Sequence, residues 1–392
     1  MKCRVLLAHV FFDVLGGGEF LALNIAKALK EHGCDVTIYT CTPMNADAVK
    51  KLFNIDVGVY RVIVRRVKSV EVLRKFAKGR MVRLRRLMAY RRFFSEYMSL
   101  GEEYDLVMDT QSNLVSPADI SYIHYPCLAG YYEGKGKGLY WRVYDWLVKY
   151  YADKFKYAVP GRILTNSLWT ASHIYKIHHV VADVVYPPVD VEYFNKVSDN
   201  DKREKLVVTV SRFTVEKNLE KIVDVAAKLR DYTFVLIGTT DEYSYIVLNE
   251  IERRIKEYRL DNVVVELNLP RHRMLRYMRD AHFYLHPEFT EHFGIAIVEA
   301  MAAGLVPMVF RGGGAWYDIV SRVDEILGYS SIYEIPKIIK HVESSRGLYE
   351  KLRARSIEVS KMFNYENFKK NLIEKIEYVL RVKRIATANS GA

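Results

Sequence analysis

Two glutamates eight positions apart stand out near the three-quarter point of the chain. Glu291 and Glu299 lie in HPEFTEHFGIAIVEAMAAGLVPMVFRGGGAWYD, which runs from His286 to Asp318. The apolar, alanine-rich stretch after Gly294 predicts a helix whose first backbone N–H groups could bind a diphosphate. Glu299, on that helix, could accept hydrogen bonds from a ribose, and Glu291, just before it, could accept them from sugar hydroxyls. The segment therefore predicts a site that holds a nucleotide sugar.

Two cations follow the first strand that we expect in the second half of the chain. Arg212 and Lys217 lie in SRFTVEKN, between the strand KLVVTVS and a helix that begins near Asn218. Cations on one strand–helix turn could neutralise a leaving diphosphate. Arginine would supply a planar fork and lysine a point charge. The same residues could also form a solvated loop with surface cations, so the motif alone leaves both interpretations open.

The first half of the chain offers glycines and a histidine. The run Gly16-Gly17-Gly18-Glu19 follows the first expected strand and opens the first helix, where glycines let the backbone approach a phosphate or sugar closely. His124 ends a later strand in the motif IHYP. A lone histidine is more often structural, and its position after a strand is what makes it a candidate. Ser167, in the motif TNSLWT, is interpreted as a cap of the next helix.

Alternating strands and helices must position these residues. Near-continuous apolar strands such as CRVLLAHV and YTFVLIG, each followed by a helix, predict parallel sheets covered on both faces. The pair Pro187-Pro188 breaks the pattern, because proline is excluded from helix interiors and central strands. We place the domain boundary in the polar stretch after it, giving domains 1–197 and 198–364. Ligands bind at the carboxyl ends of strands in such domains, where all the candidate loops lie.

Composition fits two globular domains. The 392 residues are half apolar, and this length exceeds one ordinary core. No apolar run reaches the roughly 18 residues that a membrane span needs, and no signal-peptide pattern follows Met1. Gln111 is the only glutamine, and such depletion fits a heat-adapted organism. We therefore expect a cytoplasmic protein.

The cysteines do not have the spacing of a metal site. They contain no CxxC pair. We expect all of them to be reduced and to act as small buried hydrophobes. These residues are Cys3, Cys34, Cys41 and Cys127.

Positive charge is concentrated in one segment. The net charge is +12, and from Arg61 to Arg92 basic residues crowd together with Glu71 as the only acid. A basic protein favours an anionic partner. Apolar residues at helical spacing between Val70 and Met98 suit a helix that lies on an anionic membrane. A helix packed on the domain with a solvated face fits equally well, and no nucleic-acid-binding motif is present, so no nucleic acid is expected.

These features together resemble the retaining family-4 glycosyltransferases of the GT-B fold. The motifs that carry the resemblance are LGGGE, YIHYP, TNSLWTASHI, VVYPPVD, SRFTVEKNLE and EHFGIAIVEAMAAG. Within that family the chain is most similar to the lipid-linked-oligosaccharide alpha-1,2-mannosyltransferases of asparagine-linked glycosylation, which share His292 where many members have glycine. The resemblance implies two Rossmann-like, doubly wound α/β domains that face a central cleft. It also implies that the final helix, within residues 365–392, packs back on the first domain.

The resemblance assigns roles to the second-domain candidates. Arg212 and Lys217 would hold the diphosphate of the donor. Glu291 would contact the transferring sugar, and Glu299 would bind the ribose. The backbone at positions 293–295 would assist at the sugar and phosphate; these residues are Phe293, Gly294 and Ile295.

In the first domain the resemblance places His124 beside the reacting sugar, with Gly17 and Gly18 lining the cleft. It implies no bound metal and no cofactor beyond the nucleotide-sugar substrate. One departure concerns Ala315, which stands after two glycines where the family usually has proline.

The resemblance implies transfer of mannose from GDP-mannose to a lipid-linked glycan at the cytoplasmic face of a membrane, with the basic segment contacting anionic lipid. A UDP-sugar donor with another glycan acceptor is the nearest alternative. Nucleotide-sugar epimerases share the fold and form a second alternative. The presence of Arg212, Lys217, Glu291 and Glu299 argues against a binding protein without catalysis.

Overall fold

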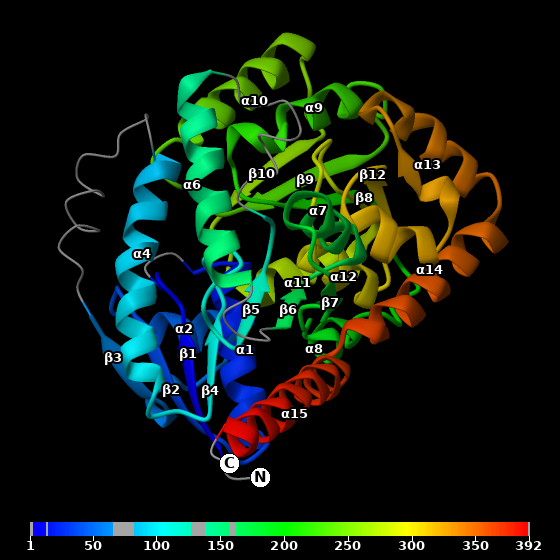
Figure 1. The fold of residues 1–392 in the computed structure, drawn as a ribbon. Coiled ribbons are helices and arrows are strands. Elements are labelled where there is room, and N and C mark those ends of the chain that lie inside the picture. Colours follow the sequence, from blue (N-terminus) through cyan, green and yellow to red (C-terminus); the bar gives the residue numbers. More distant parts are fainter. Residues whose placement is uncertain (1–2, 13–14, 66–81, 127–137, 157–161, 391–392) are drawn as a thin grey trace. The chain divides into compact units, whose positions relative to one another are not determined.

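The chain forms two compact units, seen in a computed structural model that describes residues 3–12, 15–65, 82–126, 138–156 and 162–390. Unit 1 contains the described residues up to Tyr186 and those from Phe368 onward, and unit 2 contains residues 187–367. Figure 1 shows the alternation of strands and helices in each unit. Within the described ranges, every helix is too short or too polar to cross a membrane.

The described part of unit 1 contains a seven-stranded parallel sheet with the order β3-β2-β1-β4-β5-β6-β7. Its strands are β1 (Arg4–Ala8), β2 (Asp35–Thr40), β3 (Arg61–Val64), β4 (Leu106–Asp109), β5 (Ile120–Ile123), β6 (Arg162–Thr165) and β7 (Ala182–Val184). Its helices are α1 (Gly17–Glu31), α2 (Ala46–Phe53), α4 (Val82–Gly101), α6 (Leu139–Lys156), α7 (Leu168–His178) and most of α15 (Tyr365–Ser390). The predicted cap of α7 is confirmed, since Ser167 Oγ accepts a hydrogen bond from the backbone N–H of Thr170 at 3.0 Å.

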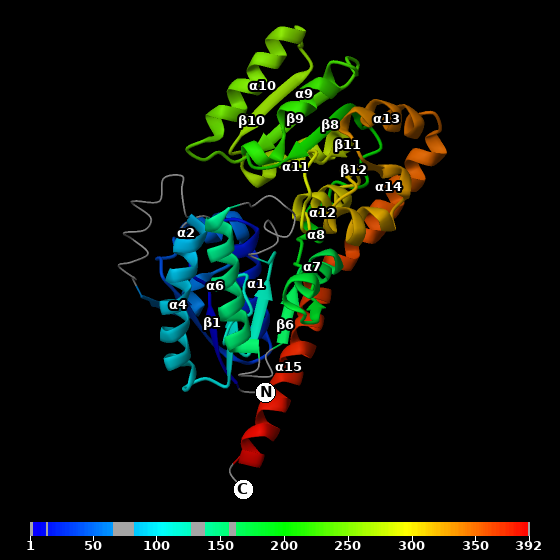
Figure 2. The same ribbon diagram turned by 45° about the horizontal axis from the view of Figure 1, so that its top comes forward.

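Helices α4 and α6 pack together over one face of this sheet, as Figure 2 shows. Their aromatic side chains form one buried cluster with residues of β1, β2 and β4. Tyr90, Phe93 and Tyr97 of α4 and Tyr144 of α6 belong to it. The part of the basic segment that lies in α4 therefore packs against the sheet through Tyr90. Residues 66–81 lie outside the described residues, so the predicted membrane contact of Arg61–Arg92 is not tested along half of its length.

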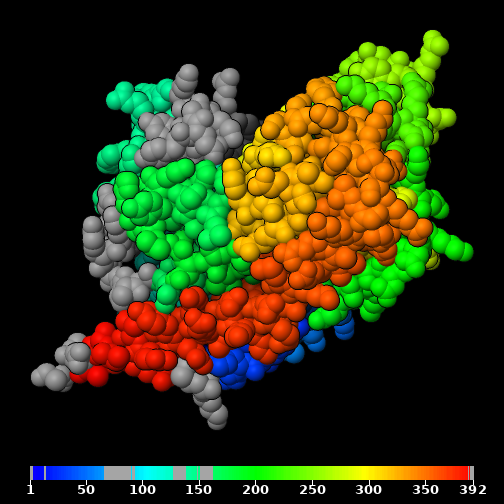
Figure 3. Space-filling view, turned by 90° about the vertical axis from the view of Figure 1, so that its right-hand side faces the viewer, coloured from blue at the N-terminus to red at the C-terminus, as the bar shows by residue number. Residues whose placement is uncertain are grey.

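Helix α15 lies against unit 1 through three lysines. Lys369 pairs with Glu31 at 2.6 Å, Lys375 with Asp183 at 3.4 Å, and Lys383 with Asp119 at 2.7 Å. Figure 3 shows this helix in red, exposed along one side of the unit. These contacts reach α1, the strand β7 and the start of β5, so one helix connects distant parts of unit 1.

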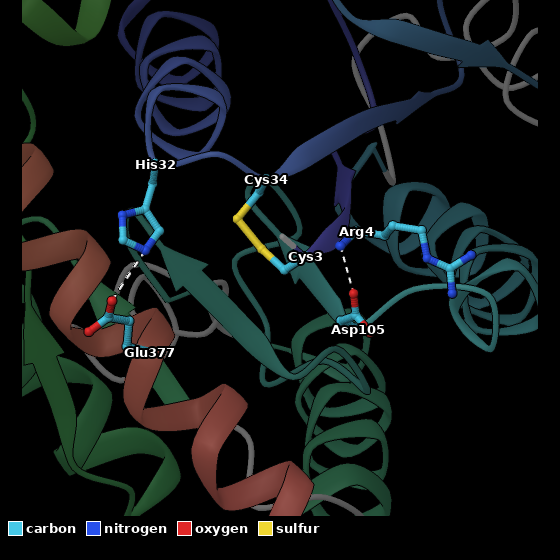
Figure 4. The surroundings of a disulfide bond; sticks show 6 residues. All are labelled: Cys3, Arg4, His32, Cys34, Asp105 and Glu377. Atoms are coloured by element: carbon cyan, nitrogen blue, oxygen red, sulfur yellow. Dashed lines mark hydrogen bonds and ion pairs between the residues drawn. A yellow bond between two sulfur atoms is a disulfide. The ribbon is translucent and has the colours of Figure 1, made fainter. Parts of the chain in front are cut away.

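The expectation of four reduced cysteines is wrong for two of them. Cys3 and Cys34 form a disulfide, with their Cα atoms 4.6 Å apart (Figure 4). The reason is strand register: the next residues along, Arg4 and Asp35, pair across β1 and β2. A separation of 31 residues carries no such signal in the sequence. Cys41 is free and buried, and the prediction for Cys127 lies outside the described residues.

Unit 2 contains a six-stranded parallel sheet with the order β10-β9-β8-β11-β12-β13. Its strands are β8 (Glu204–Val210), β9 (Thr233–Gly238), β10 (Val263–Leu267), β11 (Ala281–Leu285), β12 (Val306–Phe310) and β13 (Gly328–Tyr329). Its helices are α8 (Val191–Asn195), α9 (Glu220–Ala226), α10 (Ser244–Tyr258), α11 (Arg271–Asp280), α12 (Ile295–Ala302), α13 (Ile335–Glu343) and α14 (Arg346–Ser360). Both sheets thus begin at the third strand, run to the first, and continue from the fourth, which is the doubly wound order.

The division between the units falls after Tyr186, earlier in the chain than the boundary expected between residues 197 and 198. The proline pair belongs to unit 2 for a local reason. Val189, just after it, donates a backbone hydrogen bond to the carbonyl of Phe363 at 2.8 Å and pairs with Asn364. The segment is therefore fixed to the end of unit 2.

Candidate active site

The strand order of unit 2 reverses between β8 and β11, and the loops after these two strands carry the candidate residues. Lys217 ends a short 3-10 turn, Val215–Lys217, after β8, and Glu291 lies between β11 and α12. Asn218 ties the loops together, because its side-chain amide donates to the carbonyl of Glu288 at 2.8 Å. In open α/β sheets this switch point is where ligands bind.

Lys217 and Glu291 form an ion pair. The ammonium of Lys217 lies 2.7 Å from Glu291 Oε2 and 3.8 Å from the centre of the Phe289 ring. His286 Nε2 lies 3.8 Å from the same carboxylate oxygen. Burial alone would raise the pKa of Glu291, but the Lys217 ammonium more than offsets this and the pKa lies at about 2. Glu291 is therefore an anion at neutral pH.

The triple glycine holds the backbone of Glu291. Gly313 pairs with Glu291 in an isolated parallel bridge, and Ala315 N–H donates to the Glu291 carbonyl at 3.3 Å. Gly313 has φ +81°, and a Cβ there would lie 2.1 Å from that carbonyl oxygen. Only glycine permits this approach. The run GGG is thus a support for the carboxylate loop.

Helix α12 begins directly after the carboxylate loop. Gly294, its N-cap, has φ +108°, a conformation that favours glycine. No described residue accepts a hydrogen bond from the backbone N–H of Gly294, Ile295 or Ala296. Such N–H groups, at the positive end of the helix dipole, can bind an anion. Phe293 is buried and meets the Phe363 ring edge-on at 5.4 Å, so its side chain serves packing.

Glu299 lies apart from this pair, in a second ionic cluster. Arg271 at the start of α11 donates to Asp190 at 2.8 Å and lies 3.7 Å from Glu299. The guanidinium also lies over the Tyr193 ring, 4.5 Å from its centre. Burial raises the pKa of Glu299 to about 7, and Arg271 only partly opposes this. Glu299 can therefore gain or lose a proton near neutral pH.

Arg212 is exposed at the start of the Lys217 loop. Within the described residues its guanidinium makes no hydrogen bond or ion pair, and the structure does not bring it to Glu291. The next residue, Phe213, is fully buried and donates its backbone N–H to Thr239 at 3.0 Å. The loop is therefore anchored while the Arg212 side chain stays accessible to a ligand.

In unit 1 the candidates meet where its own sheet reverses, between β1 and β4. His124 Nε2 lies 3.0 Å from the carbonyl of Thr110, just after β4. The His124 carbonyl accepts from the amide of Asn166 at 2.9 Å. A Cβ on Gly18 would lie 3.8 Å from the His124 ring, so the glycine run and the histidine are neighbours. Gly17 is exposed at the start of α1.

Glu19, which ends the glycine run, is occupied inside unit 1. One carboxylate oxygen accepts from the backbone N–H of Gly16 at 2.9 Å, and the other accepts from Gln111 at 3.3 Å and lies 3.5 Å from His9. Burial would raise the pKa of Glu19, but the His9 and Gly16 contacts bring it below its usual value. An anion therefore already stands at the start of α1, which disfavours a phosphate there.

Three residues of this geometry were missed in the sequence. His286 was noted only as the start of the carboxylate segment, and Asp190 only as part of the proline motif. Arg271 was not noted at all. Its position directly after Pro270, at the start of a helix that follows a strand, was the available signal.

Two family profiles match the chain. "Glycosyltransferase Family 4" matches residues 15–193 and "Glycosyl transferases group 1" matches residues 190–359, so together they cover most of both units. Among curated relatives, the "GDP-Man:Man(3)GlcNAc(2)-PP-Dol alpha-1,2-mannosyltransferase" of Neurospora crassa is 28% identical over 296 residues, covering 66% of this chain and 51% of the relative. The Mus musculus protein of that name is 32% identical over 197 residues, covering 44% and 39%. The chain thus spans about half the length of these relatives or less.

Solved structures share the fold at low identity. Anabaena HepE in complex with UDP has a TM-score of 0.71 at 14% identity and covers 96% of this chain and 100% of that one. Sucrose-phosphate synthase from Thermosynechococcus elongatus also has a TM-score of 0.71, at 16% identity, and covers 97% and 100%. The glycosyltransferase WaaG has a TM-score of 0.66 at 14% identity and covers 94% and 98%.

Proposed function

Because the chain belongs to the family-4, group 1 glycosyltransferases of the GT-B fold, we propose that it transfers mannose from GDP-mannose to a lipid-linked glycan. The observation that carries this proposal is the Lys217–Glu291 pair beside the N-terminus of α12. It joins a cation, an anion and backbone N–H groups at one sheet edge. These are the groups that a diphosphate and sugar hydroxyls require.

In this proposal Arg212 and Lys217 bind the donor diphosphate. The backbone at residues 293–295 receives a phosphate or sugar oxygen. Glu299 accepts hydrogen bonds from the ribose. Each assignment follows the position of the group: cations on the β8 loop, N–H groups at the start of α12, and a carboxylate further along α12.

Retention of configuration implies attack on the face that the diphosphate leaves. The leaving diphosphate then takes the proton of the acceptor hydroxyl, and Arg212 and Lys217 stabilise the charge that develops on it. Glu291 orients the sugar and supports positive charge at its ring. His124 of unit 1 is assigned to the reacting sugar, with Gly17 and Gly18 near it. The neutral hydrogen bonding around His124 suits hydroxyl groups better than phosphate.

The choice of mannose and GDP follows the names of the relatives. Eight curated relatives carry the name quoted above, from fungi, vertebrates and a slime mould. HepE binds UDP-glucose on the same fold, so a UDP-sugar donor with another glycan acceptor is the second candidate. A nucleotide-sugar epimerase is the third.

A panel of GDP- and UDP-sugars tests these alternatives by thermal shift. A ligand at a hundredfold excess over its Kd should raise stability by about 2.7 kcal/mol. We expect GDP-mannose to give the largest shift, and a larger shift with any UDP-sugar would contradict the donor assignment. Release of GDP only when a lipid-linked glycan is present separates a transferase from an epimerase or a binding protein.

We also propose that unit 1 contacts the cytoplasmic face of an anionic membrane. The basic segment Arg61–Arg92 supports this by its charge. Helix α6 supports it by shape, because it carries an exposed apolar stripe at helical spacing beside α4. The stripe consists of Leu139, Val143, Trp146 and Tyr150, which are 76%, 40%, 64% and 53% exposed. Exposed aromatic residues beside cations are typical of helices that lie in a membrane interface.

Flotation with anionic liposomes tests this contact. Converting Arg83, Arg85 and Arg86 to serine should reduce flotation and activity on a lipid-linked acceptor, and should leave donor binding unchanged. Each cation near such a surface contributes about 1 kcal/mol, and salt should weaken the wild type likewise. The matched control removes three exposed lysines of unit 2: Lys337, Lys340 and Lys351. Equal flotation of the two triple variants would contradict the proposal.

A further inference from the structure

His286 is a buried histidine whose ring has no hydrogen-bond partner among the described residues. It is 4% exposed, and both ring nitrogens are buried without a partner. Its backbone is held on both sides: its N–H donates to Met308 at 2.9 Å, and its carbonyl accepts from Tyr329 at 2.5 Å. The backbone of His286 is therefore held, while its ring nitrogens have no hydrogen-bond partner among the described residues, although buried polar groups are bonded in the great majority of cases.

This ring lies close to a side chain of the candidate site. His286 Nε2 lies 3.8 Å from Glu291 Oε2, the oxygen that accepts from Lys217 at 2.7 Å. Burial lowers the pKa of His286 to about 4, so the ring is neutral at pH 7 and carries one N–H donor. A neutral imidazole can donate to Glu291 without adding a second positive charge beside Lys217.

Binding of a diphosphate changes the partners of Glu291. On the proposed function, on which this argument rests, Lys217 turns toward the phosphate oxygens. A diphosphate carries more negative charge than one carboxylate, so it competes well for the ammonium. Glu291 would then remain as a mostly buried anion whose other oxygen accepts from the N–H of His292 at 3.1 Å. A buried anion that loses its partner is costly unless another donor replaces it.

We propose that His286 is a positioning residue that replaces Lys217 as the hydrogen-bond donor to Glu291 when the nucleotide sugar binds. The movement needed is small, since a contact of 3.8 Å has to shorten to about 2.8 Å. The N–H of His286 then keeps Glu291 ionised and directed at the sugar hydroxyls. This accounts for a buried, uncharged ring whose nitrogens have no hydrogen-bond partner among the described residues.

Two substitutions separate this role from simple packing. His286→Phe keeps the volume and removes the donor, whereas His286→Gln keeps an N–H near the position of Nε2 and cannot ionise. We expect His286→Phe to lower kcat by about a hundredfold at saturating donor. His286→Gln should recover turnover to within about tenfold of the wild type. The calorimetric Kd for GDP should weaken in His286→Phe, because binding then leaves Glu291 without a donor, and should stay within about threefold of the wild type in His286→Gln.

The dependence of kcat on pH gives a second test, because a residue that only fills space would not change it. The titratable groups that face Glu291 are Lys217, His286, His292 and, on β11, Tyr284. Without the His286 donor, the pKa of Glu291 in the donor complex should rise, so the acid limb of kcat shifts to higher pH in His286→Phe and stays in place in His286→Gln. The control is His282→Phe on β11, the strand that precedes His286, which should leave kcat and its pH profile unchanged.

Three results would overturn the inference. They are wild-type turnover in His286→Phe, equal loss in the Phe and Gln variants, and loss of turnover without movement of the acid limb. Thermal melts in the absence of ligand show whether each variant is folded, and if His286→Phe is not, His286→Leu takes its place. Failure of the proposed function would give a different result, because the wild type itself would then show no acceptor-dependent release of GDP.

Discussion

The two units place the same sheet edge in very different chemical surroundings. In unit 2 the switch point holds a pair of charged side chains, Lys217 and Glu291. In unit 1 the equivalent edge holds His124 and neighbouring side chains bonded to backbone carbonyls and amides. Its carboxylate, Glu19, caps the start of its own helix.

The difference shows that strand order selects the location and the loops select the ligand. A charged edge suits the diphosphate donor, and a neutral edge suits hydroxyl groups. This division can be tested, because substitutions in unit 2 should change donor chemistry and those in unit 1 should not.

Lys217→Ala should have the greatest consequence for the charged edge. Loss of a preorganised cation typically costs a hundredfold or more in kcat. The fold should also weaken, by about 3 kcal/mol at pH 7, because Glu291 would remain mostly buried without its cation. Lys217 therefore serves the fold as well as the ligand, since it is buried and paired.

The sign of the pH dependence follows from the pKa of Glu291, which is about 2 in the fold against an ordinary 4.5. In the wild type the ionised Glu291 carboxylate stabilises the fold above pH 4.5, and this contribution to stability is lost as the pH falls toward 2. In Lys217→Ala, burial that no cation opposes raises the pKa of Glu291. The free energy of unfolding that the variant loses relative to the wild type should therefore become smaller as the pH falls from 7 to 4. Denaturation at both pH values measures this, and an equal deficit would contradict the ion-pair account.

Arg212→Ala should lower kcat by about a hundredfold with no loss of stability, since its guanidinium is exposed. Comparison of this variant with Lys217→Ala distinguishes Arg212, which is expected to contact only the ligand, from Lys217, which also stabilises the fold. Turnover at saturating donor and thermal melts measure the two effects. Near-wild-type turnover would remove Arg212 from the diphosphate site.

His124→Ala tests the neutral edge. We expect kcat to fall by tenfold or more while the Kd for free GDP stays the same, because His124 is assigned to the sugar and not to the nucleotide. His173→Ala, a second unit 1 histidine, on α7, is the matched control. Weaker GDP binding in His124→Ala would show that the division of roles between the units is wrong.

Glu299→Gln should have the mildest outcome, a donor affinity weaker by about tenfold. The pKa of Glu299 is raised to about 7, so ionisation destabilises the fold as the pH rises from 4.5 through 7. The ionised carboxylate accepts ribose hydrogen bonds better, so GDP affinity of the wild type should increase between pH 6 and 8. Calorimetry across that range should show no such slope in the variant, and a persistent slope would assign the titration elsewhere.

Sequence patterns were sufficient for the architecture and for the loops, because apolar periodicity and glycine positions report on the backbone directly. The strands on either side of Lys217 and Glu291 were predicted, whereas the short helices α2 and α13 and the edge strand β13 were not. Short elements at the edge of a unit carry too few residues to show a period.

Contacts between distant residues were not predictable in the same way. The Cys3–Cys34 disulfide depends on the register of two strands, and the Arg271–Asp190 pair depends on how α11 meets α8. The burial of Lys217 was missed because a lysine in a polar motif gives no sign of the aromatic ring beneath it.

The close approach of Gly313 to the carbonyl of Glu291 limits how this gene can change. Every amino-acid replacement reachable from a glycine codon by one nucleotide brings a Cβ, and a Cβ at this position would overlap that carbonyl. Gly17, exposed at the start of α1, has no such restriction. In a library of random point mutations, position 313 should therefore be depleted of every missense variant, while position 17 tolerates small residues.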